Sequence, residues 1–148
     1  LNGFIDNYNI WTPGKSTYFA NDISNLISPD LYREQFLPYD CRISETMDMS
    51  WLHVHSGGAR LVPEFRKITN LRAIQIVNDS PAGPTAKELI PIFKMIQENH
   101  CLLLRKYSKE ELKEIVPHIS LQGLYVDTQA DSEEEAFRIL EWWNRIAK

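Results

Sequence analysis

Short apolar runs alternate with amphipathic segments along most of the chain. Each apolar run has the length of a strand, and the first is rich in threonine, aromatic residues and isoleucine. They extend from Ser16 to Asn21-Asp22 and over residues 50–55, 71–77, 101–104 and 124–126. Residues 1–15 show no clean period and contain the turn signal Trp11-Thr12-Pro13-Gly14, so we interpret them as a lead-in segment.

A helix is expected after each strand, and four of the five begin with a recognisable signal. Ser28-Pro29 combines a capping serine with a proline at the first helical position. The sequence also predicts capping boxes from Thr85 to Glu88, Ser108 to Glu111 and Ser132 to Glu135. The fifth helix is expected from about Arg60 to Ile68.

The first and the last of these helices each show an apolar stripe. The first is expected to be kinked at Pro38 and to bury Leu31, Tyr32, Phe36, Tyr39, Ile43 and Met47. The terminal helix is expected to bury Ala136, Phe137, Leu140, Trp143 and Ala147.

Five strand–helix units in strict alternation predict an α/β fold with a parallel sheet in a single domain covering residues 1–148. Two architectures fit this order: a doubly wound open sheet, and part of a (β/α)8 barrel. In both, ligands bind at the carboxyl edge of the strands. The chain contains neither GxGxxG nor GxxxxGK[ST], which weakens the nucleotide-binding version of the open sheet.

The stretch WLHVHSGGAR, residues 51–60, carries the most specific candidate chemistry. In an extended strand, His53 and His55 project from the same face, which suits a shared metal ion or ligand. Gly57 and Gly58 then allow a sharp turn that brings backbone amides near a bound molecule before Ala59 starts a helix. The alternative is that one imidazole is a core residue bonded to a carbonyl.

Other polar residues follow the predicted strands and are expected on the same edge. Asp22 and Asp79 are candidates for acid/base catalysis or for orienting a histidine, although aspartates at such positions also form turns and caps. Arg105 suits a substrate carboxylate, and as an alternative it is a solvated charge. The remaining candidates are Asp127 as a metal ligand and Tyr18 and Gln129 as substrate-binding residues.

Charge and hydropathy exclude several classes of function. The net charge is −4 and no Lys/Arg block exceeds two residues, so the sequence offers no track for nucleic acid. There is no apolar run of membrane-spanning length and no signal peptide, which favours a cytoplasmic protein. Cys41 and Cys101 form no CxxC pair and are expected to be reduced thiols in the core.

Three segments together resemble the C-terminal half of the uroporphyrinogen decarboxylase superfamily. They are PGKSTYFANDISNLISPDLYREQFLPYD, WLHVHSGGA, and LRAIQIVND followed by GPTAKELIPIFKMIQ, and the resemblance extends over about residues 10–147. The superfamily includes decarboxylases and corrinoid-dependent methyltransferases that act on thiol coenzymes. The resemblance implies a (β/α)8 barrel, of which the five units would be the last five, and the start at Leu1 suggests a piece of a longer protein. An arc of five strands has two open edges, through which we expect self-association or rearrangement into an open sheet.

The methyltransferase branch implies a zinc site made of a His-x-Cys pair and a cysteine near the last strand, which activates a substrate thiol. Here His53 matches the family histidine, His55 replaces the first cysteine, and Asp127 stands near the last strand. This set predicts Zn²⁺ with one open position for a small-molecule substrate, and it makes a corrinoid protein a possible partner. The loss of both cysteines is a departure from the family pattern.

Two alternatives remain open at this stage. Decarboxylation of a porphyrinogen is disfavoured because the family's Gly-His-Gly-Ile run is replaced by residues 124–129, LYVDTQ, and its aspartate and arginines belong to the first half. The other alternative is a binding or assembly module without catalysis. The piece alone is expected to be inactive, and in the favoured reading its parent is an enzyme.

Overall fold

The structure, a computed structural model, describes residues 3–6 and 8–146. Its central sheet contains five parallel strands in the order of the sequence. They are β3 (Ser16–Ala20), β4 (Met49–His55), β5 (Leu71–Val77), β6 (Cys101–Arg105) and β7 (Leu124–Asp127). The α-helices are α1 (Pro29–Gln35), α2 (Leu37–Glu45), α3 (Val62–Phe65), α4 (Ala86–Gln97), α5 (Lys109–Ile115) and α6 (Glu133–Ile146). Short 3-10 helices are η1 (Asp22–Asn25), η2 (Ser56–Leu61) and η3 (Val116–His118).

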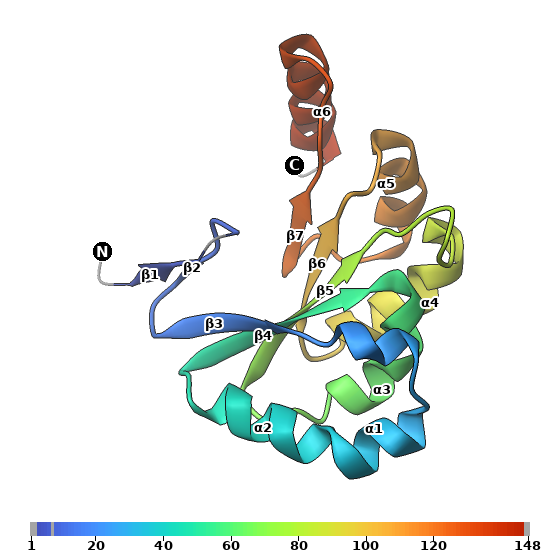
Figure 1. The fold of residues 1–148 in the computed structure, drawn as a ribbon. Helices are drawn as coiled ribbons and strands as arrows, with labels where there is room; N and C mark the ends of the chain where they lie inside the picture. Colours follow the sequence, from blue (N-terminus) through green and yellow to red (C-terminus); the bar gives the residue numbers. More distant parts are fainter. Residues whose placement is uncertain (1–2, 7, 147–148) are drawn as a thin grey trace.

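The order of the strands explains why α1 to α5 all lie on one face of the sheet (Figure 1). A right-handed crossover between parallel strands places its helix on a fixed face, and here every new strand is added on the same side of the previous one. A doubly wound sheet needs a reversal of strand order, and the five strands of the described chain show none. The architecture is therefore α/β with a helix-flanked parallel sheet, compatible with part of an α/β barrel.

The expected helix starts are largely confirmed. Ser28 Oγ accepts a hydrogen bond from Leu31 N at 3.2 Å, and Thr85 and Ser108 form complete capping boxes. The box at Ser132 is half formed: its Oγ accepts from Glu135 N, but the Glu135 carboxylate accepts from Asp131 N instead. The sequence therefore predicted these helix starts well, because a capping side chain and its hydrogen-bond partners lie within one helical turn of each other.

Helix continuity and helix faces differ from expectation in the first half. The helix expected to kink at Pro38 is broken into α1 and α2 at Phe36, because proline lacks the N–H that a continuous helix requires. The break changes the buried face. Leu31, Tyr39 and Ile43 are 44%, 59% and 44% exposed, and the buried positions are Tyr32, Asp40 and Ser44.

Two further boundaries were wrong. The first strand ends at Ala20, and Asp22 already belongs to η1. The helix expected over 60–68 begins earlier, as η2 at Ser56, and ends earlier, as α3 at Phe65. Pro63 lies in the first turn of α3. The glycine turn is therefore itself helical.

Helix α6 follows β7, the last strand of the sheet, and extends beyond the end of that strand (Figure 1). Ile139 is its buried residue, whereas Phe137 and Leu140 of the expected stripe are 58% and 56% exposed, and Ala147 lies outside the described residues. No described strand continues the sheet past β7, so the stripe has little surface to cover. None of the described helices is long and apolar enough to cross a membrane.

The two faces of the sheet differ in what covers them. Alternate residues such as Leu52, Ile74 and Leu104 face the helices and belong to the main core. The intervening residues Trp51, Ala73 and Leu103 form a smaller apolar cluster on the opposite face. That face is the one that would line the interior of a barrel.

The predicted lead-in segment is more ordered than the sequence indicated. Strands β1 (Phe4–Ile5) and β2 (Trp11–Thr12) form an antiparallel pair beside the open face (Figure 1). Asp6 Oδ2 accepts a hydrogen bond from Trp51 Nε1 at 2.7 Å, and Tyr8 packs edge-on against Tyr18 and Trp51. These contacts are long-range, which explains why no local pattern announced them.

Candidate metal centre

Neighbouring parallel strands bring four polar side chains together at the carboxyl edge of the sheet. His53 and His55 lie on β4 and, as alternation predicts, on the same face. Asp22 begins η1 directly after β3, and Asp79 follows β5. The strand order β3-β4-β5 thus places the histidines between the two carboxylates.

His55 is held by the carboxylate of Asp79. The His55 Nδ1 atom lies 2.8 Å from Asp79 Oδ1, while Asp79 Oδ2 accepts hydrogen bonds from Ser56 N at 2.9 Å and Ser56 Oγ at 3.1 Å. Burial disfavours the charged form of Asp79, but the hydrogen bond and charge of His55, together with the Ser56 bonds, hold its pKa below the ordinary value. An ionised Asp79 accepts the Nδ1 proton, which leaves His55 Nε2 available as a ligand atom.

His53 is oriented in the same way by a buried amide. Its Nδ1 atom lies 2.5 Å from Gln75 Oε1, and Gln75 is fully buried on β5 in register with His53. An amide oxygen accepts, so His53 Nδ1 carries the proton and Nε2 is again the free atom. Both histidines therefore have a tautomer fixed through Nδ1.

Asp22 completes a possible ligand set with the two histidines. One ligand atom from each of Asp22, His53 and His55 lies within 4.8 Å of the others, and the distance from His55 Nε2 to Asp22 Oδ1 is 3.9 Å. The imidazole rings are almost perpendicular, with an interplanar angle of 89° and centroids 5.4 Å apart. Two histidines and one carboxylate form a known catalytic zinc ligand set with a vacant position for substrate.

A buried network fixes the chain just before Asp22. Asn21 N donates to His53 O at 3.2 Å, and Asn21 Nδ2 donates to Asp40 Oδ2 at 2.9 Å. Tyr32 Oη donates to the same oxygen at 2.6 Å. Burial raises the pKa of Asp40, although both hydrogen bonds oppose that rise. The network connects α1 and α2 to the end of β3 and so positions Asp22 next to His55.

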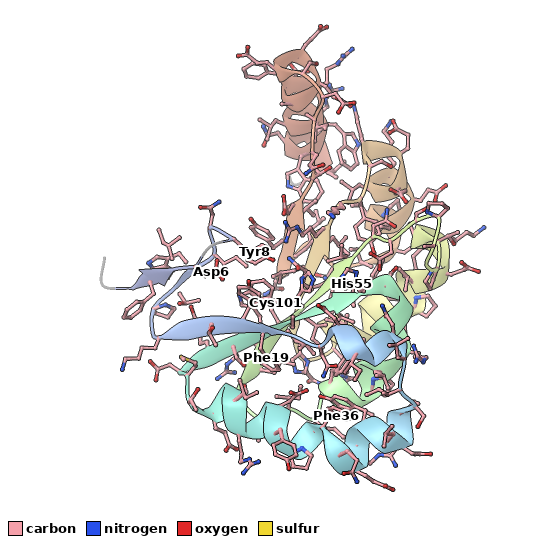
Figure 2. All side chains as sticks on the ribbon, viewed as in Figure 1. Asp6, Tyr8, Phe19, Phe36, His55 and Cys101 are labelled. Carbon is pink, nitrogen blue, oxygen red and sulfur yellow. The ribbon has the colours of Figure 1, made fainter. Side chains whose placement is uncertain are left out.

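The glycines of the turn have different roles. Gly57 lines a hollow of about 440 Å³ together with Asn25, His55, Asp79 and Gly83. Gly58 is buried, and a Cβ there would collide with Ser24 Oγ. Gly57 is therefore placed to contact a ligand, whereas Gly58 is needed for the close packing of η2 on η1. Figure 2 shows His55 at the end of β4, near this turn.

Three of the predicted residues lie away from the histidines. Asp127 ends β7, with β5 and β6 between it and β4, and its Oδ2 atom lies 3.2 Å from Arg105 Nε. The Arg105 guanidinium therefore pairs with Asp127, and its Cζ atom lies over the ring of Tyr8, 4.6 Å from the ring centroid. Gln129 is exposed beyond β7. The group of possible metal ligands among the described residues therefore contains Asp22 with His53 and His55, and Asp127, two strands further along the sheet, is not part of it.

Tyr18, the other residue expected to bind substrate, lies in an aromatic cluster. It stacks on Trp51 with ring centroids 4.8 Å apart and an interplanar angle of 24°. It lies on β3 opposite Trp51, one inward-facing position before Ala20 and His53. Tyr18 thus packs against Trp51 in the apolar cluster of the open face.

The sequence reasoning missed Gln75, Ser56 and Asp40. Gln75 had a detectable signal, since it is a polar residue inside the apolar run LRAIQIV and shares the inward face with Ala73 and Val77. Asp40 and Ser56 gave no comparable signal. Their roles depend on contacts between segments distant in sequence.

Comparison of the chain with models of known families, with curated proteins and with solved structures finds no match.

Proposed function

We propose that Asp22, His53 and His55 bind a zinc ion and that the chain is part of a (β/α)8 barrel enzyme of the uroporphyrinogen decarboxylase superfamily. The proposed reaction is methyl transfer to a thiol or a related small substrate. Sequential strand order with helices on one face supports the barrel. One observation supports the metal site. His53 and His55 each have Nδ1 bonded to an oxygen acceptor, and one ligand atom of each lies within 4.8 Å of the other and of a ligand atom of Asp22.

The chemistry follows from the ligand types. A bound zinc ion lowers the pKa of a coordinated thiol, so that the thiolate is available at neutral pH. Two neutral histidines and one aspartate leave a net positive site, which favours an anionic sulfur. In the transfer, the thiol proton goes to water, sulfur bonds to the methyl carbon, and the donor keeps the electron pair of the bond that breaks. A methylated corrinoid protein is a donor able to keep that pair.

Asp79 and Gln75 would keep the histidines in the correct tautomer. Outer hydrogen bonds of this kind fix the ring orientation of ligand histidines and strengthen metal binding. Gly57 and the hollow beside His55 would receive the substrate. Each residue thus has a role set by its contacts.

Calorimetric titration of zinc tests the proposal. We expect one zinc ion per chain in the wild type and loss of binding in His53→Ala. His118→Ala is the matched control, because His118 is an exposed histidine on η3. Absence of zinc uptake by the wild type, or equal uptake by His53→Ala, would contradict the proposal.

A non-catalytic assembly module is the second candidate, favoured by the open edges of β3 and β7. It predicts self-association without any dependence on zinc. Self-association through these edges is expected for both candidates, whereas zinc uptake is expected for the enzyme alone, so the zinc titration separates the two functions.

A further inference from the structure

The tip of the β1–β2 hairpin lies on the open face of the sheet, opposite α1 to α5 (Figure 2). We call Asp6 and residues 8–10 the tip. Asp6 Oδ1 accepts hydrogen bonds from Tyr8 N at 2.8 Å and from Ile10 N at 3.0 Å. The other oxygen, Oδ2, accepts from Trp51 Nε1 at 2.7 Å. One carboxylate therefore both folds the tip and fastens it to β4.

Tyr8 extends the tip across β5. Its ring centroid lies 4.9 Å from that of Trp51 on β4 and 4.6 Å from Cζ of Arg105 on β6. Tyr125 Oη on β7 donates a hydrogen bond to Tyr8 O at 3.0 Å. β5 runs between β4 and β6, and Gln75 lies on it midway between the residues opposite Trp51 and Arg105. The ring of Tyr8 therefore covers the stretch of β5 that carries Gln75, which is fully buried.

Gln75 connects the tip to the metal centre. Its Oε1 atom accepts the hydrogen bond that fixes the tautomer of His53. The Nε2 atom of the same amide is buried and has no hydrogen-bond partner among the described residues. An unpaired buried donor costs free energy, and water that reaches the donor removes this cost. The docked tip therefore protects the His53–Gln75 bond from water, while the unpaired donor beneath it favours lifting.

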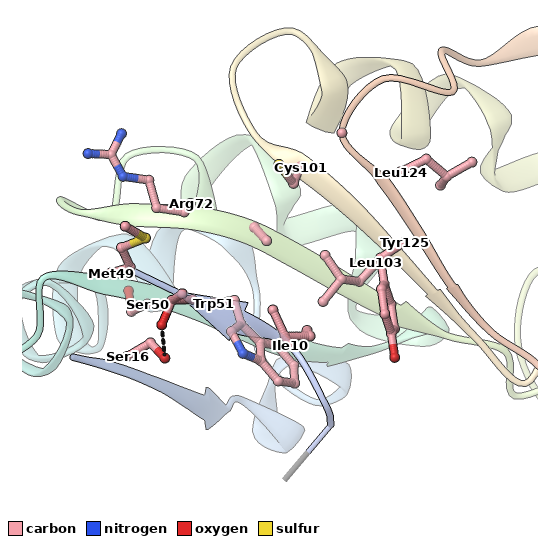
Figure 3. Close-up of a pocket in the computed structure, with 13 residues that line it drawn as sticks. Ile10, Ser16, Met49, Ser50, Trp51, Arg72, Cys101, Leu103, Leu124 and Tyr125 are labelled. Atoms are coloured by element: carbon pink, nitrogen blue, oxygen red, sulfur yellow. Dashed lines mark hydrogen bonds between the residues drawn. The ribbon is translucent and has the colours of Figure 1, made fainter. Parts of the chain in front are cut away.

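The tip is attached to the sheet only locally. β1 and β2 form a two-stranded sheet of their own, and Phe4 and Ile5 of β1 are exposed. Ile10 and Trp51 line a pocket of about 310 Å³ that remains open beside the tip (Figure 3). Cys101 at the border of this pocket is exposed, in contrast to the core position expected for it. Segments with so few buried contacts open at a small cost in free energy, so the tip can lift while the five strands stay folded.

We propose that the tip is a lid over Gln75, on the open-face side of the metal centre. In the docked state it excludes water from the His53–Gln75 bond and keeps the proton of His53 on Nδ1. In the lifted state water competes for the amide of Gln75, and His53 populates both tautomers. The effect on zinc rests on the proposed metal centre, whereas the movement of the lid does not.

Hydrogen exchange of the Trp51 indole N–H, followed by NMR, measures the movement. Tyr8→Ala keeps the carboxylate of Asp6 but removes the ring that covers β5. We expect Trp51 to exchange at least about tenfold faster in this variant, because the tip opens as a unit. The backbone amide of Ile74, buried on β5, should exchange at the wild-type rate. Tyr39→Ala, at an exposed tyrosine of α2, is the matched control and should change neither rate.

The tautomer of His53 is a second readout that needs no metal. Imidazole nitrogen shifts report it at a pH about two units above the ordinary histidine pKa of about 6.5. We expect the Nδ1–H form alone in the wild type and both forms in Tyr8→Ala. Asp6→Asn, which weakens the bond to Trp51, should give the same mixture and tests the lid with a second variant.

Zinc affinity should fall in both variants, because a mixture of tautomers presents His53 Nε2 as a ligand atom for only part of the time. A wild type that takes up no zinc would refute the metal centre alone. The lid is refuted by an unchanged Trp51 rate in Tyr8→Ala, by an equal acceleration at Ile74, or by a single His53 tautomer in both variants.

Discussion

His55 Nδ1 and Asp79 Oδ1 lie 2.8 Å apart, and this contact between β4 and the end of β5 fixes which nitrogen of His55 faces Asp22. The contact joins an imidazole to an ionised carboxylate that is itself held by Ser56 N and Oγ. It therefore links the backbone turn after β4 to the orientation of a proposed metal ligand.

Asp79→Asn should weaken zinc binding by about 10- to 100-fold, the range found for loss of an outer hydrogen-bond partner of a ligand histidine. Asparagine keeps the size of the side chain but loses the charge. The measurement is a competitive zinc titration against a chelating dye. An Asp79→Asn variant with wild-type affinity would show that Asp79 only shapes the turn.

The choice of the third ligand can be tested by paired substitutions. Asp22→Asn should reduce zinc affinity by about tenfold or more, because the carboxylate charge is lost from the ligand set. Asp127→Asn should leave it unchanged, since Asp127 pairs with Arg105 and lies on β7, with β5 and β6 between it and β4. The opposite result would restore the ligand set expected from the resemblance alone.

The low pKa of Asp79 predicts how stability depends on pH. A carboxyl whose pKa is lower in the folded state stabilises the fold above its unfolded pKa of about 3.9, and this contribution is lost as the pH falls through the folded value. The difference in unfolding free energy between wild type and Asp79→Asn should therefore be constant near neutral pH and shrink in acid. Urea unfolding at a series of pH values measures it. A difference that grows below pH ~4 would contradict the assignment.

Tyr32→Phe should lower the unfolding free energy by about 1.5–3 kcal/mol, because it removes a hydrogen bond to the buried carboxyl of Asp40. Tyr39→Phe is the control. Tyr39 is 59% exposed, so its loss of a hydroxyl should change stability by less than about 0.5 kcal/mol. Equal effects of the two substitutions in urea unfolding would mean that the Asn21–Asp40–Tyr32 network does not support the end of β3.

The open edges of the sheet predict self-association. Thr17 lies on β3, an edge strand, and a lysine there should discourage strand pairing between chains. Light scattering over a concentration series should show a mass above that of one chain in the wild type and a lower mass for Thr17→Lys. Asn144→Lys, at an exposed position of α6, is the control. A wild type that stays monomeric throughout would refute the prediction.

The sequence predicted the structural features that depend on periodicity. It failed for the features that depend on contacts between segments distant along the chain. Alternation placed His53 and His55 on one face, and strand–helix alternation gave a parallel sheet. Periodicity did not determine whether Asp22 or Asp127 lies next to the two histidines, because that depends on strand order and on η1. The pairing of Gln75 with His53 depends on the shifted register of β4 and β5, which no local pattern encodes.

The proposed metal centre is tested most directly by anomalous diffraction at the zinc absorption edge from crystals grown with zinc. We predict one strong peak within bonding distance of His53 Nε2, His55 Nε2 and the Asp22 carboxylate. A map without a peak there, or with zinc bound only at other residues such as His118, would contradict the account.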